Sequence, residues 1–376
     1  MLIRSDKDMT SMKLLYIADR GFARYGGRYF FSRPNYVNTN LYKKYFDEIV
    51  YIARNDNYNS TFYPMEERAK VALLRKNDFK GLRHTLKEWE DQYDAALLIS
   101  DVYGFFAIRQ LNKLNKKSIA YCGADPLQLY LSKHSFLSVI KGYVLYVIKR
   151  KIVSHADYVQ YCTEILYKRY PCRCKKLICS NVEIKVYDNV LEKRLKKILD
   201  GDKCKVIGLM GRVVKNKGID IAIRALSRLG KEYSLEIVGE MDTQNWNDYV
   251  IKYGVQNRVT FLGYISDGDK INEWLDNIDV YIQPSRSEGL PRSVIEAMAR
   301  ACPVAASNVG GIPDLIDNKY LSNPEDDQSL ADNILKLMGN KEHALNQAEV
   351  NFERSKEYSI EVRNQKLENF YKNIKK

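Results

Sequence analysis

The sequence lacks the patterns that mark membrane-spanning, secreted and metal-binding chains. It has only four histidines in 376 residues, and their spacing predicts no metal site. Its seven cysteines are odd in number and contain no C-x-x-C pair, which argues against a complete disulfide framework. No uncharged apolar run reaches about 18 residues, and residues 1–7 lack the apolar core of a signal peptide. We therefore expect a cytoplasmic protein without a transmembrane helix.

Positive charge is unevenly distributed along the chain, whose formal net charge is +13. Residues 1–199 carry 36 Lys and Arg against 20 Asp and Glu, whereas residues 200–376 carry 24 against 27. This asymmetry predicts that the first half faces an anionic partner. Nucleic acid, an anionic membrane and a phosphorylated acceptor are all compatible with the charge alone.

Short apolar runs alternate with helical patterns in both halves, which is typical of parallel doubly wound sheets. The length also favours two domains over one. The expected strands lie at 13–19, 48–53, 95–100, 118–122, 158–162, 176–179, 205–210, 234–238, 259–262, 279–283, 303–306 and 320–321. The charged segment 183–203 is interpreted as a structure-poor linker between the halves.

The most informative stretch is Pro284–Ala299, in which Glu288 and Glu296 stand eight positions apart. It predicts a strand, a glycine turn and a helix, with Pro291 at the first helical position. The helix N-terminus attracts anions, and the carboxylates can accept hydrogen bonds from hydroxyl groups of a sugar or ribose. The alternative is a solvated helix charge and an ordinary turn residue.

This stretch resembles the E-x7-E signature of the retaining family 4 glycosyltransferases, glycosyl transferases group 1, which have the GT-B fold. The resemblance is dense in the second half and loose in the first. It continues in Gly211–Gly218, Leu235–Glu240, Val259–Tyr264 and Val304–Asp314. It implies an α/β protein with two Rossmann-like doubly wound domains facing a central cleft. Residues 1–190 would bind the acceptor, 191–356 would bind the nucleotide sugar, and a last helix at about 357–376 would pack back on the first domain.

The resemblance also implies roles for individual residues. Arg212 and Lys217 would contact the donor diphosphate, Glu288 the donor sugar and Glu296 the ribose hydroxyls. The remaining donor-binding candidates are Gly239, Gly263, Tyr264, Ile265, Gly289 and Leu290, together with Gly26 and Gly27, which resemble the glycine loop of the first domain. A Gly-Gly pair also marks any tight turn.

The first domain departs from the family pattern. Many relatives place a histidine after a strand there, but the corresponding stretch Tyr121–Pro126 contains none. Asp125 is the candidate for this catalytic place, Asp101 is second, and His134 is the one histidine to test. An Asp-Pro pair is also a plain turn.

Residues 135–153 form an apolar, aromatic segment that ends in the basic cluster Lys149, Arg150 and Lys151. As a helix it could lie in a membrane interface with these cations at lipid phosphates. It could equally be a buried helix with a solvated C-terminal end.

The expected function is that of a retaining, metal-independent hexosyltransferase without a cofactor. It would move a sugar from a UDP- or GDP-linked donor to a lipid-linked or growing saccharide, as in surface polysaccharide, O-antigen or capsule assembly, and could be peripheral on the inner face of the cytoplasmic membrane. Asp267-Gly268-Asp269 resembles a metal motif, but a helix cap explains it better. The alternatives are a GT-B nucleotide-sugar epimerase and a basic nucleic-acid-binding protein.

Overall fold

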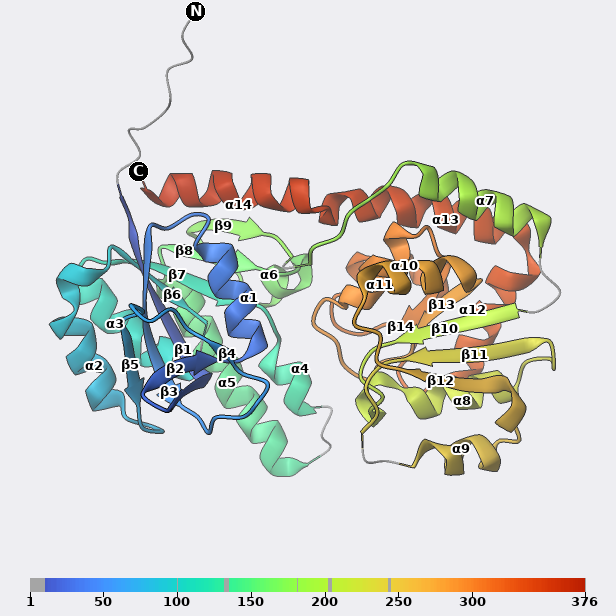
Figure 1. Ribbon diagram of the computed structural model, residues 1–376, viewed down its shortest axis with the longest axis horizontal. Coiled ribbons are helices and arrows are strands. Elements are labelled where there is room, and N and C mark those ends of the chain that lie inside the picture. Colours follow the sequence, from blue (N-terminus) through green and yellow to red (C-terminus); the bar gives the residue numbers. More distant parts are fainter. Residues whose placement is uncertain are drawn as a thin grey trace, which may run out of the picture. The chain divides into compact units, whose positions relative to one another are not determined.

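The computed structural model describes residues 11–99, 101–131, 135–180, 182–201, 205–242 and 245–375. The chain divides into two compact units, the first formed by residues 1–179 and 365–376 and the second by residues 180–364. Both are α/β units; the sheet of the second is parallel, and that of the first is mainly parallel with two antiparallel strand pairs (Figure 1). The α/β class expected from the sequence is therefore confirmed.

The first unit contains a nine-stranded sheet. Its strands are β1 (Lys13–Tyr25), β2 (Arg28–Phe31), β3 (Glu48–Asn55), β4 (Tyr63–Pro64), β5 (Val71–Leu74), β6 (Ala95–Leu98), β7 (Lys117–Cys122), β8 (Tyr158–Tyr161) and β9 (Lys175–Ile178). Its helices are α1 (Arg33–Tyr42), α2 (Phe79–Glu88), α3 (Asp101–Lys113), α4 (Pro126–Leu131), α5 (Phe136–His155), α6 (Glu164–Arg169) and most of α14 (Ile360–Lys375). Strands β3 and β6 flank β1 in parallel, so the sheet grows outward from β1.

Both faces of this sheet are buried. Successive residues of a strand point to opposite faces, and Leu15 and Ile17 belong to one core while Leu14 and Tyr16 belong to the other. The second of these cores includes four residues of α14, namely Leu367, Phe370, Tyr371 and Ile374. The end of the chain thus completes the first unit.

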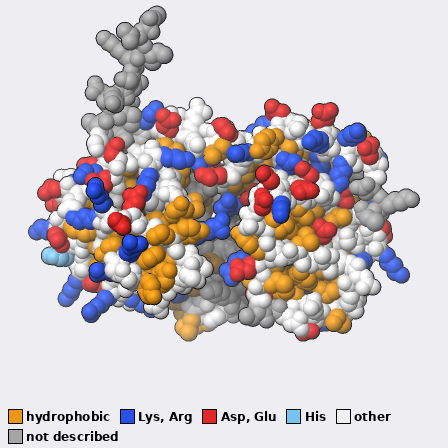
Figure 2. All heavy atoms as spheres, in the orientation of Figure 1, with side chains coloured by type: hydrophobic (Ala, Val, Ile, Leu, Met, Phe, Trp, Pro, Cys, Tyr) orange, Lys and Arg blue, Asp and Glu red, His pale blue; other side chains and the backbone are white. Residues whose placement is uncertain are grey.

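The strands β2, β4 and β5 were not expected from the sequence. β1 continues past the predicted end at residue 19 and pairs antiparallel with β2 through a hairpin whose turn is Gly26-Gly27. These glycines have φ values of +55° and +78°, as a two-residue hairpin turn requires. Beside the hairpin the rings of Tyr25 and Tyr58 stack with their centroids 4.5 Å apart. Figure 2 shows hydrophobic side chains gathered on the surface of this unit.

The second unit contains a six-stranded parallel sheet in the order β12-β11-β10-β13-β14-β15. Its strands are β10 (Lys205–Met210), β11 (Tyr233–Val238), β12 (Val259–Gly263), β13 (Val280–Gln283), β14 (Val304–Ser307) and β15 (Leu321–Ser322). Its helices are α7 (Asn189–Asp200), α8 (Ile219–Ser227), α9 (Trp246–Lys252), α10 (Gly268–Asn277), α11 (Arg292–Ala299), α12 (Asp327–Gly339) and α13 (Lys341–Ser355). Figure 1 shows α10 and α11 on one side of this sheet and α8 and α9 on the other. This order is that of a Rossmann-type doubly wound sheet.

The expectation of a structure-poor linker over 183–203 is wrong, because α7 occupies most of it. Arg194 explains why α7 is held in the second unit. Its guanidinium is buried and donates to the carbonyl oxygens of Leu275 and Ile278, both at 2.6 Å. The charged pattern had predicted a structure-poor segment, but the Arg194 cation pairs with the free carbonyl groups at the end of α10.

Every helix in the described part of the chain is too short or too polar to cross a bilayer. The six described cysteines are free thiols.

Replacing Arg194 by Met should lower the free energy of unfolding of the second unit by about 3 kcal/mol, because several buried carbonyls lose their donor. Urea unfolding followed by tryptophan fluorescence measures this, since Trp246 and Trp274 lie in this unit. Lys193→Met is the matched control on the exposed side of the same helix and should change stability by less than about 0.5 kcal/mol. Equal losses in the two variants would contradict the role given to Arg194.

Candidate functional site

The candidate site lies at the carboxyl edge of the second unit's sheet, where the strand order reverses between β10 and β13. Parallel α/β sheets bind ligands at this point. Lys217 follows β10, and Glu288 follows β13, so both reach the same edge. Gly239, directly after β11, and Gly263, the last residue of β12, lie at this edge as well.

Two glycines bring the loops of this edge into backbone contact. A Cβ atom on Gly239 would lie 1.7 Å from the carbonyl oxygen of Gly211. A Cβ on Gly218, which has a φ of +73°, would lie 1.9 Å from the carbonyl oxygen of Pro284. Neither position accepts a side chain, so the loops after β10, β11 and β13 are packed directly on one another.

The carboxylate of Glu288 is the centre of the site. Its exposed fraction is 8%, and its Oε1 atom accepts hydrogen bonds from Lys217 Nζ at 2.6 Å, Ser285 Oγ at 2.6 Å and Gln283 Nε2 at 3.1 Å. Its Oε2 atom accepts no hydrogen bond from the residues that the structure describes. Glu288 is therefore held firmly through one oxygen and offers the other.

A hydrogen-bond chain from the core fixes the donors to Glu288. Tyr281 OH and Ser293 Oγ donate to Gln283 Oε1 at 2.8 and 3.0 Å, and Gln283 Nε2 also donates to Ser285 Oγ at 2.8 Å. Burial raises the pKa of Tyr281, which therefore stays a neutral donor. Gln283 and Ser285 were not among the predicted site residues; a polar side chain that ends an otherwise apolar strand was the available signal.

Glu296 lies on α11, one turn beyond the start of the helix. It is half-buried, and its carboxylate accepts no hydrogen bond from the described part of the chain. Burial raises its pKa, while the positive charge of Arg292 acts in the opposite direction. The helix begins at Arg292, so Pro291 is the N-cap residue and not the first helical residue as expected.

The other predicted donor-binding residues are arranged around these carboxylates. Arg212 is exposed, and its guanidinium makes no hydrogen bond or ion pair with the described residues. Gly289 accepts a backbone hydrogen bond from Gly311 at 2.6 Å, and Leu290 packs on the core. After β12, Gly263 accepts from the Gly239 amide at 2.8 Å, Tyr264 is 63% exposed and Ile265 packs on the core.

A buried ion pair that sequence reasoning missed holds the loop of Glu288. Arg286 donates to both oxygens of Asp220 at 2.9 and 2.8 Å, and it also contacts Glu325. Burial alone would raise the pKa of Asp220, but the hydrogen bonds from Arg286 and the charges of Arg286 and Arg224 hold it below its usual value. The Arg286 amide also donates to the carbonyl oxygen of Asn216 at 2.9 Å.

The carboxylate of Asp125, the catalytic candidate of the first unit, accepts hydrogen bonds from neighbouring residues. Its Oδ1 accepts from Tyr170 OH at 2.7 Å and from the Leu127 amide at 3.0 Å, and its Oδ2 pairs with Arg169. These contacts tie the start of α4 to the end of α6. They fit the alternative reading, in which the Asp-Pro pair marks an ordinary turn. The side chain of Asp101 and all of His134 lie outside the described residues.

Gly26 and Gly27, predicted to form a phosphate-binding loop, form the hairpin turn described above. Asp267 caps α10 as expected, since its side chain accepts from the Asp269 amide at 2.9 Å. No group of three or more potential metal-ligating side chains occurs among the described residues.

The first unit has its own cavity of about 620 Å³, which the sequence did not predict. It lies at the carboxyl edge of the parallel strands, because Ala18 is the last residue of β1 before its pairing with β3 becomes irregular, Ile99 follows β6 and Ala124 follows β7. Among its described lining residues Asp19 is the only acid, and the cations are Arg20, Arg54, Lys76, Lys141 and Lys149.

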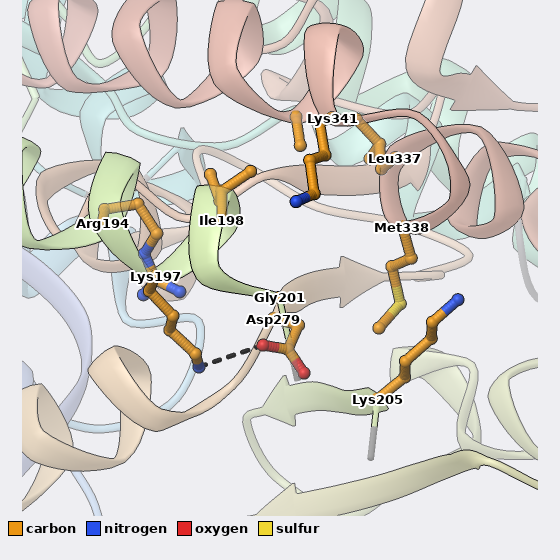
Figure 3. Close-up of a pocket in the computed structure, with 10 residues that line it drawn as sticks. Arg194, Lys197, Ile198, Gly201, Lys205, Asp279, Leu337, Met338 and Lys341 are labelled. Carbon is orange, nitrogen blue, oxygen red and sulfur yellow. Dashed lines mark ion pairs between the residues drawn. The ribbon is translucent and has the colours of Figure 1, made fainter. Parts of the chain in front are cut away.

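A further pocket of about 320 Å³ lies at the opposite, amino edge of the second unit's sheet. Lys205 begins β10 and Asp279 directly precedes β13. Lys197 pairs with Asp279 at 3.0 Å (Figure 3). Ligand sites of parallel sheets lie at the carboxyl edge, so we assign this pocket to the packing of α7 against α12 and α13.

Residues 192–354 match the model of the family described as glycosyl transferases group 1. Among curated proteins, the chain is 29% identical over 334 residues to protein CapJ of Staphylococcus aureus, covering 84% of this chain and 83% of CapJ. It is 26% identical over 255 residues to the capsular polysaccharide biosynthesis glycosyltransferase CapM of the same species, covering 59% of this chain and 63% of CapM.

Among solved structures, Anabaena HepE in complex with UDP matches with a TM-score of 0.70 at 18% identity, covering 96% of this chain and all of HepE. Sucrose-phosphate synthase from Thermosynechococcus elongatus matches with the same TM-score at 17% identity, covering 96% of this chain and 99% of that chain. The chain has the GT-B fold, as the sequence had predicted.

Replacing Asp220 by Asn should lower the free energy of unfolding by about 2 kcal/mol at neutral pH, because Arg286 loses a buried charged partner. The pKa of Asp220 is lowered by folding, so its contribution is complete above the ordinary carboxyl pKa of about 3.9 and is lost as pH falls through the folded value. Urea unfolding of wild type and variant from neutral pH to about pH 3 measures the difference, which should shrink only at the acidic end.

Asp269→Asn is the matched control, because Asp269 is also the second residue of its helix but is exposed. It should leave stability almost unchanged at every pH. A difference between wild type and Asp220→Asn that persists undiminished at the acidic end would contradict this account.

Proposed function

We propose that this protein is a retaining, metal-independent glycosyltransferase that uses a UDP- or GDP-linked hexose as donor. The observation that carries the proposal is the Glu288 carboxylate, which is held by Lys217, Gln283 and Ser285 through Oε1 and offers Oε2. Its place at the strand reversal of a doubly wound sheet supports nucleotide-sugar binding. The similarity to CapM and the UDP complex of HepE support the same activity.

In this proposal the second unit binds the donor. The ribose hydroxyls donate to Glu296, whose carboxylate lacks a partner among the described residues and whose raised pKa reflects burial without such partners. Arg212 and Lys217 neutralise the diphosphate, and the free amides at the start of α11 can donate to it as well. Oε2 of Glu288 accepts from a hydroxyl group of the sugar. The bases of UDP or GDP would be bordered by Gly263, Tyr264 and Ile265.

The proposed reaction breaks the bond between the anomeric carbon and the β-phosphate oxygen and forms a bond from that carbon to the acceptor oxygen. The leaving diphosphate takes the bonding electron pair and accepts the proton of the acceptor hydroxyl on the same face of the sugar. Configuration is therefore retained. Arg212 and Lys217 act by stabilising the negative charge that develops on the diphosphate, so no cofactor or metal enters the scheme.

We propose a lipid-linked or growing saccharide as the acceptor, bound by the first unit on the cytoplasmic side of the membrane. The support is the basic cavity of that unit, in which five cations face one acid. Apolar residues such as Leu129 and Leu145 line the same cavity. Cations beside apolar surface suit a molecule that carries phosphate next to hydrocarbon.

Lys217→Ala should weaken binding of the preferred nucleoside diphosphate at least tenfold, about the value of a charge-assisted hydrogen bond. Calorimetry against UDP and GDP with EDTA present measures the affinity and identifies the base. Lys215→Ala, two residues earlier on the same turn and exposed, is the control and should bind as wild type does. If no nucleotide binds to wild type in EDTA, the donor site as proposed is refuted.

Glu288→Gln should lower kcat for sugar transfer by about a hundredfold, while affinity for the free nucleotide changes less than about threefold. Glutamine keeps an oxygen for Lys217, Gln283 and Ser285 but replaces the accepting Oε2 by a donor. Transfer assays and calorimetry on one preparation separate the two effects. Glu240→Gln, an exposed carboxylate after β11, should leave both unchanged. An unaltered kcat in Glu288→Gln would remove Glu288 from the reaction.

A further inference from the structure

Helix α5 carries an apolar stripe that the protein leaves exposed. Phe136 and Leu137, at 79% and 75% exposed, are the two most exposed large apolar side chains in the described chain. The stripe continues at helical spacing, which places its members on one face of α5. It consists of Phe136, Leu137, Ile140, Tyr143, Val144 and Val147, of which the last four are 47–54% exposed.

The opposite face of α5 is packed into the first unit. Ile152 and Val153 belong to the core beneath the sheet, and α5 contacts both α3 and α4. A Cβ atom on Gly142 would lie 3.0 Å from Tyr130 Cβ, so α4 rests closely on this helix. The helix is therefore anchored on one side, and the stripe is not the free surface of a loosely attached segment.

The charge around the stripe has one sign. Arg150 and Lys151 continue the exposed face by one turn, and Lys141 borders it. Residues 126–155, which include α4 and α5, contain no Asp or Glu. Arg150 lies over the ring of Tyr146 and Lys151 over that of Phe105, at 5.9 Å each, so both cations stay beside apolar surface.

The exposed apolar side chains and the positive charge of α5 together indicate what kind of partner covers the stripe. A symmetric contact with a second copy would bring the same cations of both chains together without any acid in the helix to pair them. Crossing a bilayer is excluded for α5 by its four basic residues. Apolar and aromatic side chains bordered by Lys and Arg on one helix suit the headgroup region of an anionic bilayer.

We propose that the exposed face of α5 docks the protein on an anionic lipid bilayer. The six apolar residues of the stripe enter the boundary between headgroups and acyl chains, and Arg150 and Lys151 pair with lipid phosphates. The inference rests on the proposed function in one respect only, namely that a lipid-linked acceptor gives the docking its purpose.

The same helix connects the bilayer to the basic cavity. Lys141, Leu145 and Lys149 are spaced four residues apart and line the cavity, while the stripe lies on another face of α5. Lys149 donates to the carbonyl oxygen of Ala124 at 2.6 Å, which fixes α5 to the loop after β7. A docked α5 therefore brings the cavity beside the headgroups, where a phosphate-bearing acceptor would be presented.

Vesicle flotation of the whole protein tests the docking. Wild type should bind vesicles of phosphatidylcholine with phosphatidylglycerol, and bind phosphatidylcholine alone far less. The triple variant Phe136→Ser, Leu137→Ser, Ile140→Ser should lose at least about tenfold in vesicle affinity. Arg150→Gln and Lys151→Gln should each lose about fivefold. Ile251→Ser, at a position 60% exposed in the second unit, is the matched control and should bind as wild type does.

Three results would overturn the docking: no binding of wild type to anionic vesicles, unchanged binding of the triple variant, or a wild-type dimer that the triple variant converts to monomer. The last would assign the stripe to a second copy. Nucleotide calorimetry on the same proteins separates this inference from the transferase proposal. Vesicle binding without nucleotide binding would leave the docking standing and refute the donor site.

Discussion

The buried pairing of Arg286 with Asp220 is the constraint on which the candidate site depends. Asp220 belongs to α8, which follows β10, and Arg286 belongs to the loop after β13. Their two hydrogen bonds therefore join the two sides of the strand reversal. Either charge alone would be costly to bury, which makes the paired geometry strongly preferred over looser ones. Glu288 stands two residues beyond Arg286, and its approach to Lys217 follows from this pairing.

The two units divide the chemistry of the proposed reaction. The second unit presents carboxylates and cations at the carboxyl edge of a six-stranded sheet, an arrangement suited to the hydroxyls and phosphates of a nucleotide sugar. The first unit presents a cavity lined by cations and an exposed apolar helix, an arrangement suited to phosphate beside hydrocarbon. The excess of positive charge in residues 1–199 is consistent with this division.

Sequence reasoning succeeded where a local pattern is sufficient. The six strands of the second unit were predicted within one or two residues, because buried parallel strands are short apolar runs. It failed where a partner far along the chain decides the structure. In the charged segment containing α7, Val190, Leu195 and Ile198 pack on the second unit, and Arg194 donates to carbonyl oxygens more than 80 residues away. The contacts of Asp125 with Tyr170 and Arg169, more than 40 residues away, were likewise not visible in the sequence.

The sequence by itself determined the GT-B fold and the placing of Glu288, Glu296, Arg212 and Lys217 near one sheet edge, since strand ends and glycine turns are local features. Only the tertiary structure decided which Glu288 oxygen is held and which is offered, because that depends on side chains from separate loops. It also decided that one face of α5 is anchored and the other exposed. A nearly continuous apolar helix shows no such difference in its sequence, because only its neighbours cover one side of it.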